Sequence, residues 1–149
     1  LKDVIVTSAG KTIAPASWEA EVEADPLIAH AVLVGEGKPY LGGIILLDTE
    51  IARSWAVRHG GDALPAPGVD GEPLTVNDEG LISVVSRVVE QVNQRFSPAE
   101  QARRIVVLLA DLSEAGGLVT PTMKLKKAVF TERVGAIIDR LYLGGGTVA

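Results

Sequence analysis

Apolar residues occur along the chain in two arrangements, as short continuous runs and as longer stretches with helical spacing. The continuous runs are rich in Val, Ile and Leu and predict strands at residues 4–7, 28–34, 40–47 and 104–109. A glycine turn at 8–11 follows the first run, and Gly35 to Pro39 between the second and third predicts a hairpin. Because the hairpin strands are apolar at nearly every position, we expect helices to cover at least one face of their sheet.

The stretches with helical spacing predict helices over residues 16–24, 50–58, 79–95 and 128–141, and a short helix over 98–103. In the first of these, Trp18 and Val22 share an apolar face, and the glutamates are interpreted as a solvated face: Glu19, Glu21 and Glu23. Helices and hairpin strands alternate irregularly along the chain. This order predicts an α+β fold in which a small antiparallel or mixed sheet has flanking helices.

Three further expectations concern two of the predicted helices and one of the predicted strands. The 50–58 helix is expected to turn one set of side chains inward: Ile51, Ala52, Trp55 and Ala56. The last helix is expected to be continuous and to be followed by Gly144 to Gly146, where regular structure ends. Gly42 and Gly43 lie inside an apolar strand and predict a bulge or the close approach of another backbone, which we favour over the passage of a ligand.

Composition narrows the class of protein. With 149 residues, 47% of them hydrophobic, the chain is long enough for one domain spanning residues 1–149. A net charge of -5 argues against nucleic-acid binding, which requires a basic surface. The chain has no cysteine, and its two histidines, His30 and His59, are expected to be structural, so no metal site is expected. No apolar run approaches the roughly 20 residues of a membrane-spanning helix, so a soluble domain is expected. The absence of cysteine is compatible with a reducing compartment, and a cytoplasmic location is expected.

The motifs of self-contained enzymes are missing from the sequence, which contains no GxSxG, HExxH, Walker or GxGxxG pattern. Two loops remain as candidate sites, one at Gly10 and Lys11 and one at Lys124. Pro121 stiffens the approach to Lys124, whose ammonium has three donors suited to a phosphate or a carboxylate. The alternative, which pattern alone favours, is that Lys124, Lys126 and Lys127 form only the solvated beginning of a helix.

Both loops resemble motifs of a known family. Residues 2–19, KDVIVTSAGKTIAPASWE, resemble the motif that opens the C-terminal domain of adenylate-forming acyl-CoA synthetases. Residues 120–127, TPTMKLKK, resemble a motif near the end of that domain in long-chain fatty-acyl-CoA ligases. The two motifs occur in the same order as in the family, so the resemblance covers nearly the whole chain.

The resemblance implies a small mobile C-terminal domain that works with a larger N-terminal domain, absent from this chain, which binds ATP and the fatty acid. In one pose Lys124 would reach the carboxylate and the α-phosphate; in the other, Gly10 with Lys11 would help to form the pantetheine tunnel. Lys2 matches the hinge. The complete enzyme would use ATP, CoA and Mg²⁺ to make acyl-AMP and then acyl-CoA. The isolated domain would be inactive and would bind none of them, and the fatty substrate makes peripheral membrane contact conceivable.

This sequence departs from the family pattern at two positions. Met123 stands where many relatives have glycine, although a bulky residue is common there in the long-chain branch. Thr12 stands where some short-chain relatives have an arginine that touches the nucleotide of CoA. Two alternatives stay open, a non-catalytic α+β binding or regulatory module and a fatty acyl-AMP ligase that passes its product to a carrier protein. Because the chain opens on Leu-Lys-Asp rather than methionine, we also expect that it was cut from something longer.

Overall fold

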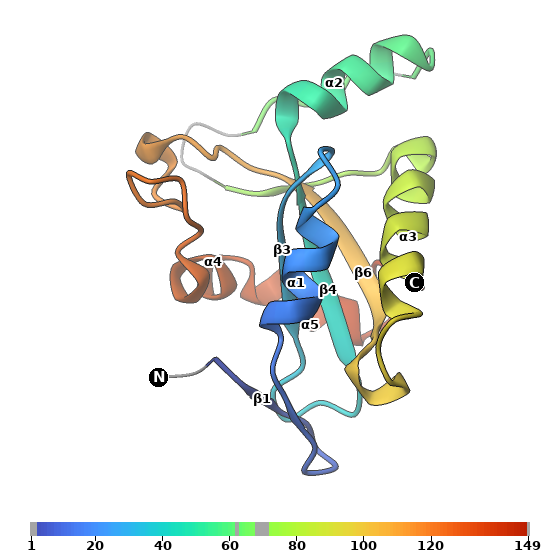
Figure 1. Cartoon of the computed structure of the whole chain (residues 1–149). Coiled ribbons are helices and arrows are strands. Elements are labelled where there is room, and N and C mark those ends of the chain that lie inside the picture. Colours follow the sequence, from blue (N-terminus) through green and yellow to red (C-terminus); the bar gives the residue numbers. More distant parts are fainter. Residues whose placement is uncertain (1–2, 62, 68–71, 149) are drawn as a thin grey trace.

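A computed structural model describes residues 3–61, 63–67 and 72–148 (Figure 1). Its elements in chain order are β1 (Ile5–Val6), β2 (Thr12–Ile13), α1 (Ala16–Glu23), β3 (Ile28–Val34), β4 (Leu41–Leu47), α2 (Thr49–Arg58), β5 (Leu74–Thr75), α3 (Glu79–Asn93), β6 (Ala102–Leu109), α4 (Lys127–Arg133), α5 (Gly135–Tyr142) and β7 (Thr147–Val148). Short 3-10 turns occupy Pro98–Glu100 and Glu114–Gly116. The predicted α+β class is confirmed.

The main sheet is mixed. Its strands lie in the order β3-β4-β6-β5, and β7 also pairs with β6. The predicted hairpin is present as β3 and β4, which pair antiparallel, whereas β6 runs parallel to β4. The strands β1 and β2 form a separate two-stranded ribbon. All seven residues of β4 are buried, as expected for the central strand of a covered sheet.

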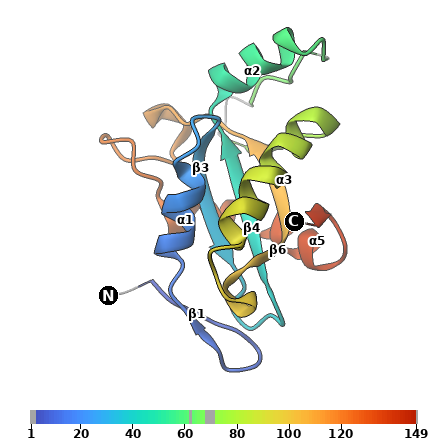
Figure 2. The same cartoon turned by 45° about the vertical axis from the view of Figure 1, so that its right-hand side comes forward.

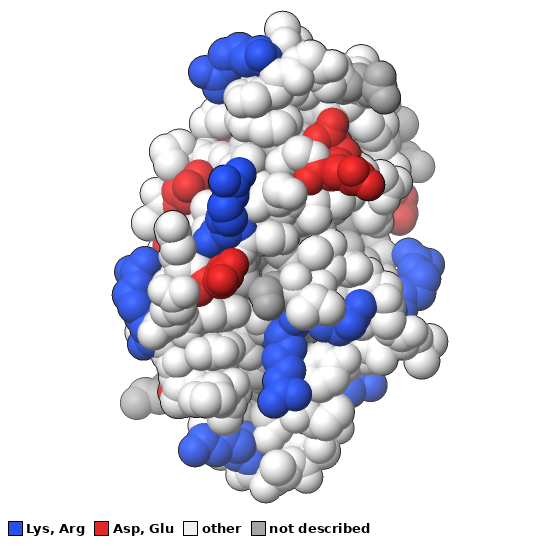
Figure 3. Space-filling view, turned by 90° about the vertical axis from the view of Figure 1, so that its right-hand side faces the viewer, with Lys and Arg blue, Asp and Glu red and all other residues white. Residues whose placement is uncertain are grey.

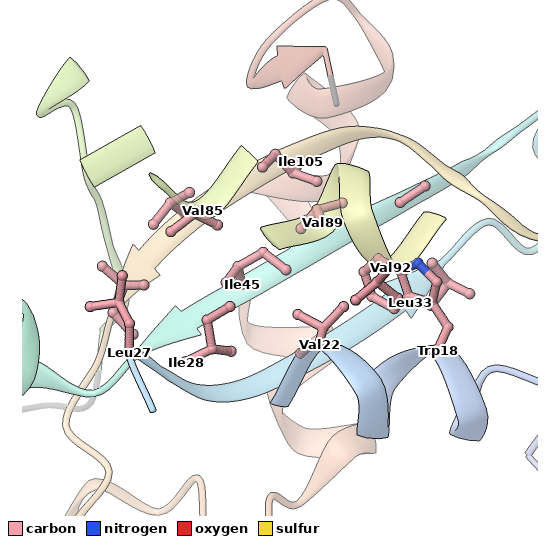
Figure 4. Packing of buried hydrophobic residues seen from close by; sticks show 14 of the residues in the cluster. Trp18, Val22, Leu27, Ile28, Leu33, Ile45, Val85, Val89, Val92 and Ile105 are labelled. Carbon is pink, nitrogen blue, oxygen red and sulfur yellow. The ribbon is translucent and has the colours of Figure 1, made fainter. Parts of the chain in front are cut away.

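Helices cover both faces of this sheet (Figure 2). On one face, Trp18 and Val22 of α1 and Val89 of α3 pack over Ile45 and Ile105 (Figure 4). The alternate residues of the same strands face the other way and pack against α4 and α5: Ile44, Leu46, Val106 and Leu108. The two hydrophobic layers explain why these strands carry no alternating polar residues.

The interpretation of the α1 glutamates as a solvated face is wrong for Glu19, whose side chain is 15% exposed, whereas Glu23 is exposed as expected. Glu19 Oε2 accepts a hydrogen bond from Leu33 N at 2.9 Å, and Glu23 Oε2 accepts one from Ala31 N at 2.9 Å. These amides lie on the outer edge of β3, which is the edge strand of the sheet. The two carboxylates therefore occupy donors that the neighbouring strand leaves unpaired, which protects an edge that could otherwise pair with another chain.

The predicted last helix is in fact two helices. α4 ends at Arg133 and α5 begins at Gly135, with Val134 between them at φ -97° and ψ 16°. Val134 is fully buried, so packing against the sheet holds the break, and glycine at the next position weakens the helix there. The glycines at 144–146 do not end regular structure either, because β7 follows and pairs with β6.

Smaller differences have local causes. The predicted helix over 98–103 is a single 3-10 turn, because β6 already begins at Ala102. Ile51 is 37% exposed rather than turned inward, whereas Ala52 and Ala56 are buried as expected. At Gly42 the pairing with β6 shifts register, and an added Cβ would lie 2.7 Å from Leu141 Cδ2. The bulge and the packing explanation are thus both supported.

One buried amide ties three elements of the core together. Asn93, at the end of α3, is 7% exposed. Its Oδ1 accepts hydrogen bonds from Trp18 Nε1 at 2.9 Å and from Ala102 N at 3.1 Å. Its Nδ2 donates to Ala102 O at 2.9 Å. The side chain therefore satisfies polar groups of α1 and β6 that would otherwise be buried without partners.

Candidate functional site

Lys124 lies at the tip of a narrow hairpin of residues 118–126. Lys126 N donates to Leu118 O at 2.7 Å, and Thr120 N donates to Lys124 O at 2.8 Å. Thr120 Oγ1 in turn accepts a hydrogen bond from Lys124 N at 3.1 Å. Leu118 is fully buried, whereas Lys124 is exposed. The hairpin is therefore anchored at its base and presents the lysine side chain to its surroundings.

The backbone at the residue before this lysine is unusual. Met123 has φ +67° and is the single non-glycine residue with positive φ among those that the structure describes. This left-handed conformation costs an L-residue about 1–2 kcal/mol, whereas glycine adopts it freely. The hairpin shape therefore favours glycine at position 123 over the methionine that is present. The Met123 side chain is 55% exposed, so its packing offsets little of that cost.

The second predicted loop is the turn of the β1–β2 ribbon. Gly10 has φ +82°, and a Cβ added there would meet no atom within 4 Å. Gly10 N donates to Thr7 O at 2.9 Å, and Thr7 N donates to Lys11 O at 2.9 Å. Ser8 N donates to Lys38 O at 2.9 Å, which ties the ribbon to the turn between β3 and β4. Gly10 and Lys11 therefore stand exposed on a well-bonded turn.

The structure does not bring the two loops together. Figure 1 shows the β1–β2 ribbon at the bottom of the molecule and the 118–126 hairpin at the upper left. Lys2, the predicted hinge residue, lies outside the described residues. The two candidate loops are therefore separate in space, and one fixed orientation of the chain could not present both to the same small ligand.

A cluster of charged side chains near the Lys124 hairpin was not predicted. The ammonium of Lys127, the first residue of α4, forms an ion pair with Asp3 and lies 3.0 and 2.8 Å from Oε1 and Oε2 of Glu19. Burial lowers the pKa of Lys127, but its hydrogen bonds to Asp3 and Glu19 outweigh that effect and the net pKa is raised. The partners are distant in sequence, so no spacing in the sequence could reveal the cluster.

A groove of about 290 Å³ separates the Lys124 hairpin from α1 and β3. Its lining includes Glu23, His30 and Lys124. His30 is half-buried, with Nδ1 3.9 Å from Glu23 Oε2, and burial lowers its pKa. The other histidine, His59, stacks on Trp55 with ring centroids 4.0 Å apart. Within the described ranges, no three His, Asp or Glu side chains gather closely enough to hold a metal ion.

Tyr142 gives a pH-dependent prediction. Its hydroxyl contacts Tyr40 O at 2.8 Å, and burial raises its pKa to about 12 from an ordinary 10. The unfolded chain therefore loses this proton first as pH rises, and the free energy of unfolding is expected to fall between pH 10 and 12. Urea unfolding at several pH values measures the fall. In Tyr142→Phe it should be shallower, and an equally steep fall in both proteins would contradict the assignment.

The family model described as "AMP-binding enzyme C-terminal domain" matches residues 2–59, which include the β1–β2 ribbon, α1 and the β3–β4 hairpin. Over these residues the chain is similar to the C-terminal domain of AMP-binding enzymes. Lys124 lies beyond the matched segment, so likeness in that region comes from individual relatives.

Two relatives extend the likeness over nearly the whole length of this chain. It is 37% identical to the long-chain-fatty-acid–CoA ligase FadD15 of Mycobacterium tuberculosis over 141 residues, which cover 95% of this chain and 23% of that protein. It is 30% identical to the long-chain-fatty-acid–CoA ligase ACSBG2 of Gallus gallus, covering 99% of this chain and 21% of that protein. The chain thus spans about a quarter of the curated relatives that it matches.

A solved structure shows the same fold. The adenylation domain of a carboxylate reductase from Mycobacterium chelonae superposes on this chain with a TM-score of 0.70 at 18% identity, covering 94% of this chain and 19% of that one. Among the helices in the described part of the chain, none has the length and apolar character needed to cross a membrane. The likeness in fold agrees with the sequence relatives.

Proposed function

We propose that this domain is the mobile C-terminal part of a fatty acid–CoA ligase, which forms acyl-AMP from ATP and a fatty acid and then transfers the acyl group to CoA. The observation that carries the proposal is the exposed Lys124 on an anchored hairpin, in a chain that resembles long-chain-fatty-acid–CoA ligases over nearly its full length. A larger N-terminal domain supplies the ATP site and the fatty-acid site, and the isolated 149-residue chain is inactive.

The role proposed for Lys124 is to stabilise negative charge. As the carboxylate attacks the α-phosphate and pyrophosphate leaves, charge develops on the phosphate oxygens. A cation placed where that charge appears lowers the barrier more than it strengthens ground-state binding. The hairpin supports this role, because its hydrogen bonds fix the backbone on both sides of Lys124 while the exposed side chain can extend toward a ligand.

The second site is proposed to serve the thioester step. Gly10 and Lys11 would lie beside the pantetheine arm of CoA after the domain rotates about Lys2. The absence of a Cβ at Gly10 lets another surface approach the turn closely. The charged side chains on the lower part of the face in Figure 3, the end that carries the ribbon, are mainly basic, which suits the phosphates of CoA.

ATP, CoA and Mg²⁺ are the proposed ligands of the complete enzyme. Mg²⁺ is proposed to accompany the ATP phosphates on the N-terminal domain, since the described residues of this chain gather no metal-binding group. The fatty acid is proposed to bind the same larger domain. We propose a cytoplasmic location for the enzyme, with any membrane contact peripheral.

The direct test measures both half-reactions in the complete protein. Formation of acyl-AMP is followed by pyrophosphate release from ATP and fatty acids of several lengths, and thioester formation is followed with supplied acyl-AMP and CoA. Activity in both steps is expected. Acyl-AMP formation with transfer only to a carrier protein would instead identify an acyl-AMP ligase, and inactivity in both steps would indicate a non-catalytic module.

The Gly10 site gives a separate prediction. Gly10→Leu in the complete enzyme is expected to lower thioester formation by about 10-fold or more while leaving adenylation near its normal rate, because the new side chain blocks the approach to the turn. The matched control is Gly60→Leu, since Gly60 has φ +66° and equal free space but lies at the end of α2. Equal losses in both half-reactions for Gly10→Leu would show that it acts through folding.

A further inference from the structure

The Lys127 ammonium directs all three of its hydrogen-bond donors to groups within the domain. It pairs with Asp3 Oδ2 and lies 3.0 and 2.8 Å from the two carboxylate oxygens of Glu19. A lysine ammonium has three donors, so these three oxygens leave none for a ligand. Lys127 therefore differs from Lys124 in the same motif, because its partners lie inside the domain.

Helix stability does not explain a lysine at this position. Lys127 is the first residue of α4, where the helix dipole presents its positive end, and the first turn of α4 has no acidic residue. A cation there is unfavourable for the helix. The carboxylates of Asp3 and Glu19 offset that cost, so the contacts between distant segments account for the residue.

Lys127 joins three segments whose relative positions must stay fixed when the domain rotates. Asp3 follows Lys2, the proposed hinge residue, directly in the chain. Glu19 is fixed to the sheet, since its Oε2 also accepts from Leu33 N at 2.9 Å. Lys127 itself follows the 118–126 hairpin that carries Lys124.

The cluster is partly withdrawn from solvent. The side chains of Glu19, Lys127 and Asp3 are 15%, 32% and 54% exposed. Charge interactions are stronger in such a site than on an open surface, where an ion pair contributes little. The cluster can therefore hold the segment after the hinge and the 118–126 hairpin in fixed relative positions.

We propose that Lys127 is a positioning residue for Lys124. By joining Asp3 and Glu19 to the beginning of α4, it makes the segment after the hinge and the Lys124 hairpin a single rigid unit. When the domain rotates at the hinge, the Lys124 ammonium then moves with the segment after the hinge as one rigid body. This inference rests on the proposed function, and it assigns to Lys127 a part in adenylation without contact with the substrates.

The test compares half-reactions in the complete enzyme. Lys127→Gln is expected to lower kcat for acyl-AMP formation by about 10- to 100-fold, the loss typical of a catalytic group misplaced by about 1 Å. Thioester formation from supplied acyl-AMP is expected to stay within about twofold of normal, because Lys124 has no part in it. Lys127→Arg, which keeps the charge, should retain most of the adenylation activity.

Two further variants separate positioning from folding. Asp3→Asn changes a largely exposed side chain and should reproduce the adenylation loss without lowering the Tm. The double variant with Lys127→Gln should lose no more than the Lys127→Gln single variant, since both changes break one connection. Lys126→Gln is the matched control, because Lys126 is an exposed lysine beside Lys127, and it should leave both rates unchanged.

Each other outcome would overturn the inference. Unchanged adenylation in Lys127→Gln, equal losses in both half-reactions, or a loss confined to thioester formation would each exclude a positioning role. The wild-type enzyme distinguishes this failure from failure of the proposed function. If the wild type performs neither half-reaction, the ligase assignment fails, whereas an active wild type with unaffected variants refutes only the role of Lys127.

Discussion

Replacing Lys124 by alanine in the complete enzyme is expected to lower the rate of acyl-AMP formation by about 10²- to 10³-fold, equivalent to about 3–4 kcal/mol of lost transition-state stabilisation. The exposed ammonium is the group that this domain would contribute to the charge developing at the α-phosphate. Because the side chain takes part in no packing of the core, the loss should come without a change in Tm. Pyrophosphate release under saturating ATP and fatty acid measures the effect.

The thioester half-reaction provides the internal reference for this variant. With supplied acyl-AMP and CoA, Lys124→Ala is expected to form thioester at close to the normal rate, because the domain then presents its other loop. Lys126→Ala is a matched control, since Lys126 is an exposed lysine two residues further on. Normal adenylation by Lys124→Ala would remove this residue from the mechanism.

Replacing Asn93 by alanine is expected to lower the free energy of unfolding of the 149-residue chain by about 3–5 kcal/mol. The substitution leaves Trp18 Nε1 and both backbone polar groups of Ala102 without their partner in the core. Each buried group left without a hydrogen bond costs about 1–3 kcal/mol. Small domains have a free energy of unfolding of only about 5–15 kcal/mol, so this one amide contributes a large share of it.

Urea unfolding followed by tryptophan fluorescence measures the loss. Asn77→Ala is the control, because Asn77 is exposed just before α3, and its replacement should cost about 0.5 kcal/mol or less. Trp18→Phe removes one of the donors that Asn93 satisfies, so its effect should be less than additive with Asn93→Ala. A loss below 1 kcal/mol for Asn93→Ala would show that other groups replace the lost hydrogen bonds.

The sequence predicted the features of this fold that depend on local pattern. The β3–β4 hairpin follows from two apolar runs and a glycine-rich turn, and α2 and α3 follow from the helical spacing of their apolar residues. The loops at Gly10 and Lys124 were also recognisable, because each combines a turn former with a lysine. In these segments neighbouring residues determine the structure.

The features that were missed depend on contacts between distant segments. Glu19 looked like a surface residue because its partners, Leu33 and Lys127, are far away in the sequence. The break at Val134 follows from packing against the sheet, which helical spacing does not encode. The two-residue strands β5 and β7 are too short to produce any periodicity.

The central pairing of the sheet also has a consequence for how the domain folds. β4 and β6 are neighbours in space, but residues 48–101 separate them in the chain, whereas β3 and β4 are joined by a short turn. Closing so long a loop is entropically costly, so we expect the hairpin to form early and β6 to dock in a slow step. Until then, the entirely apolar β4 offers an unpaired edge to other nascent chains, and aggregation during synthesis or refolding is the hazard that this topology carries.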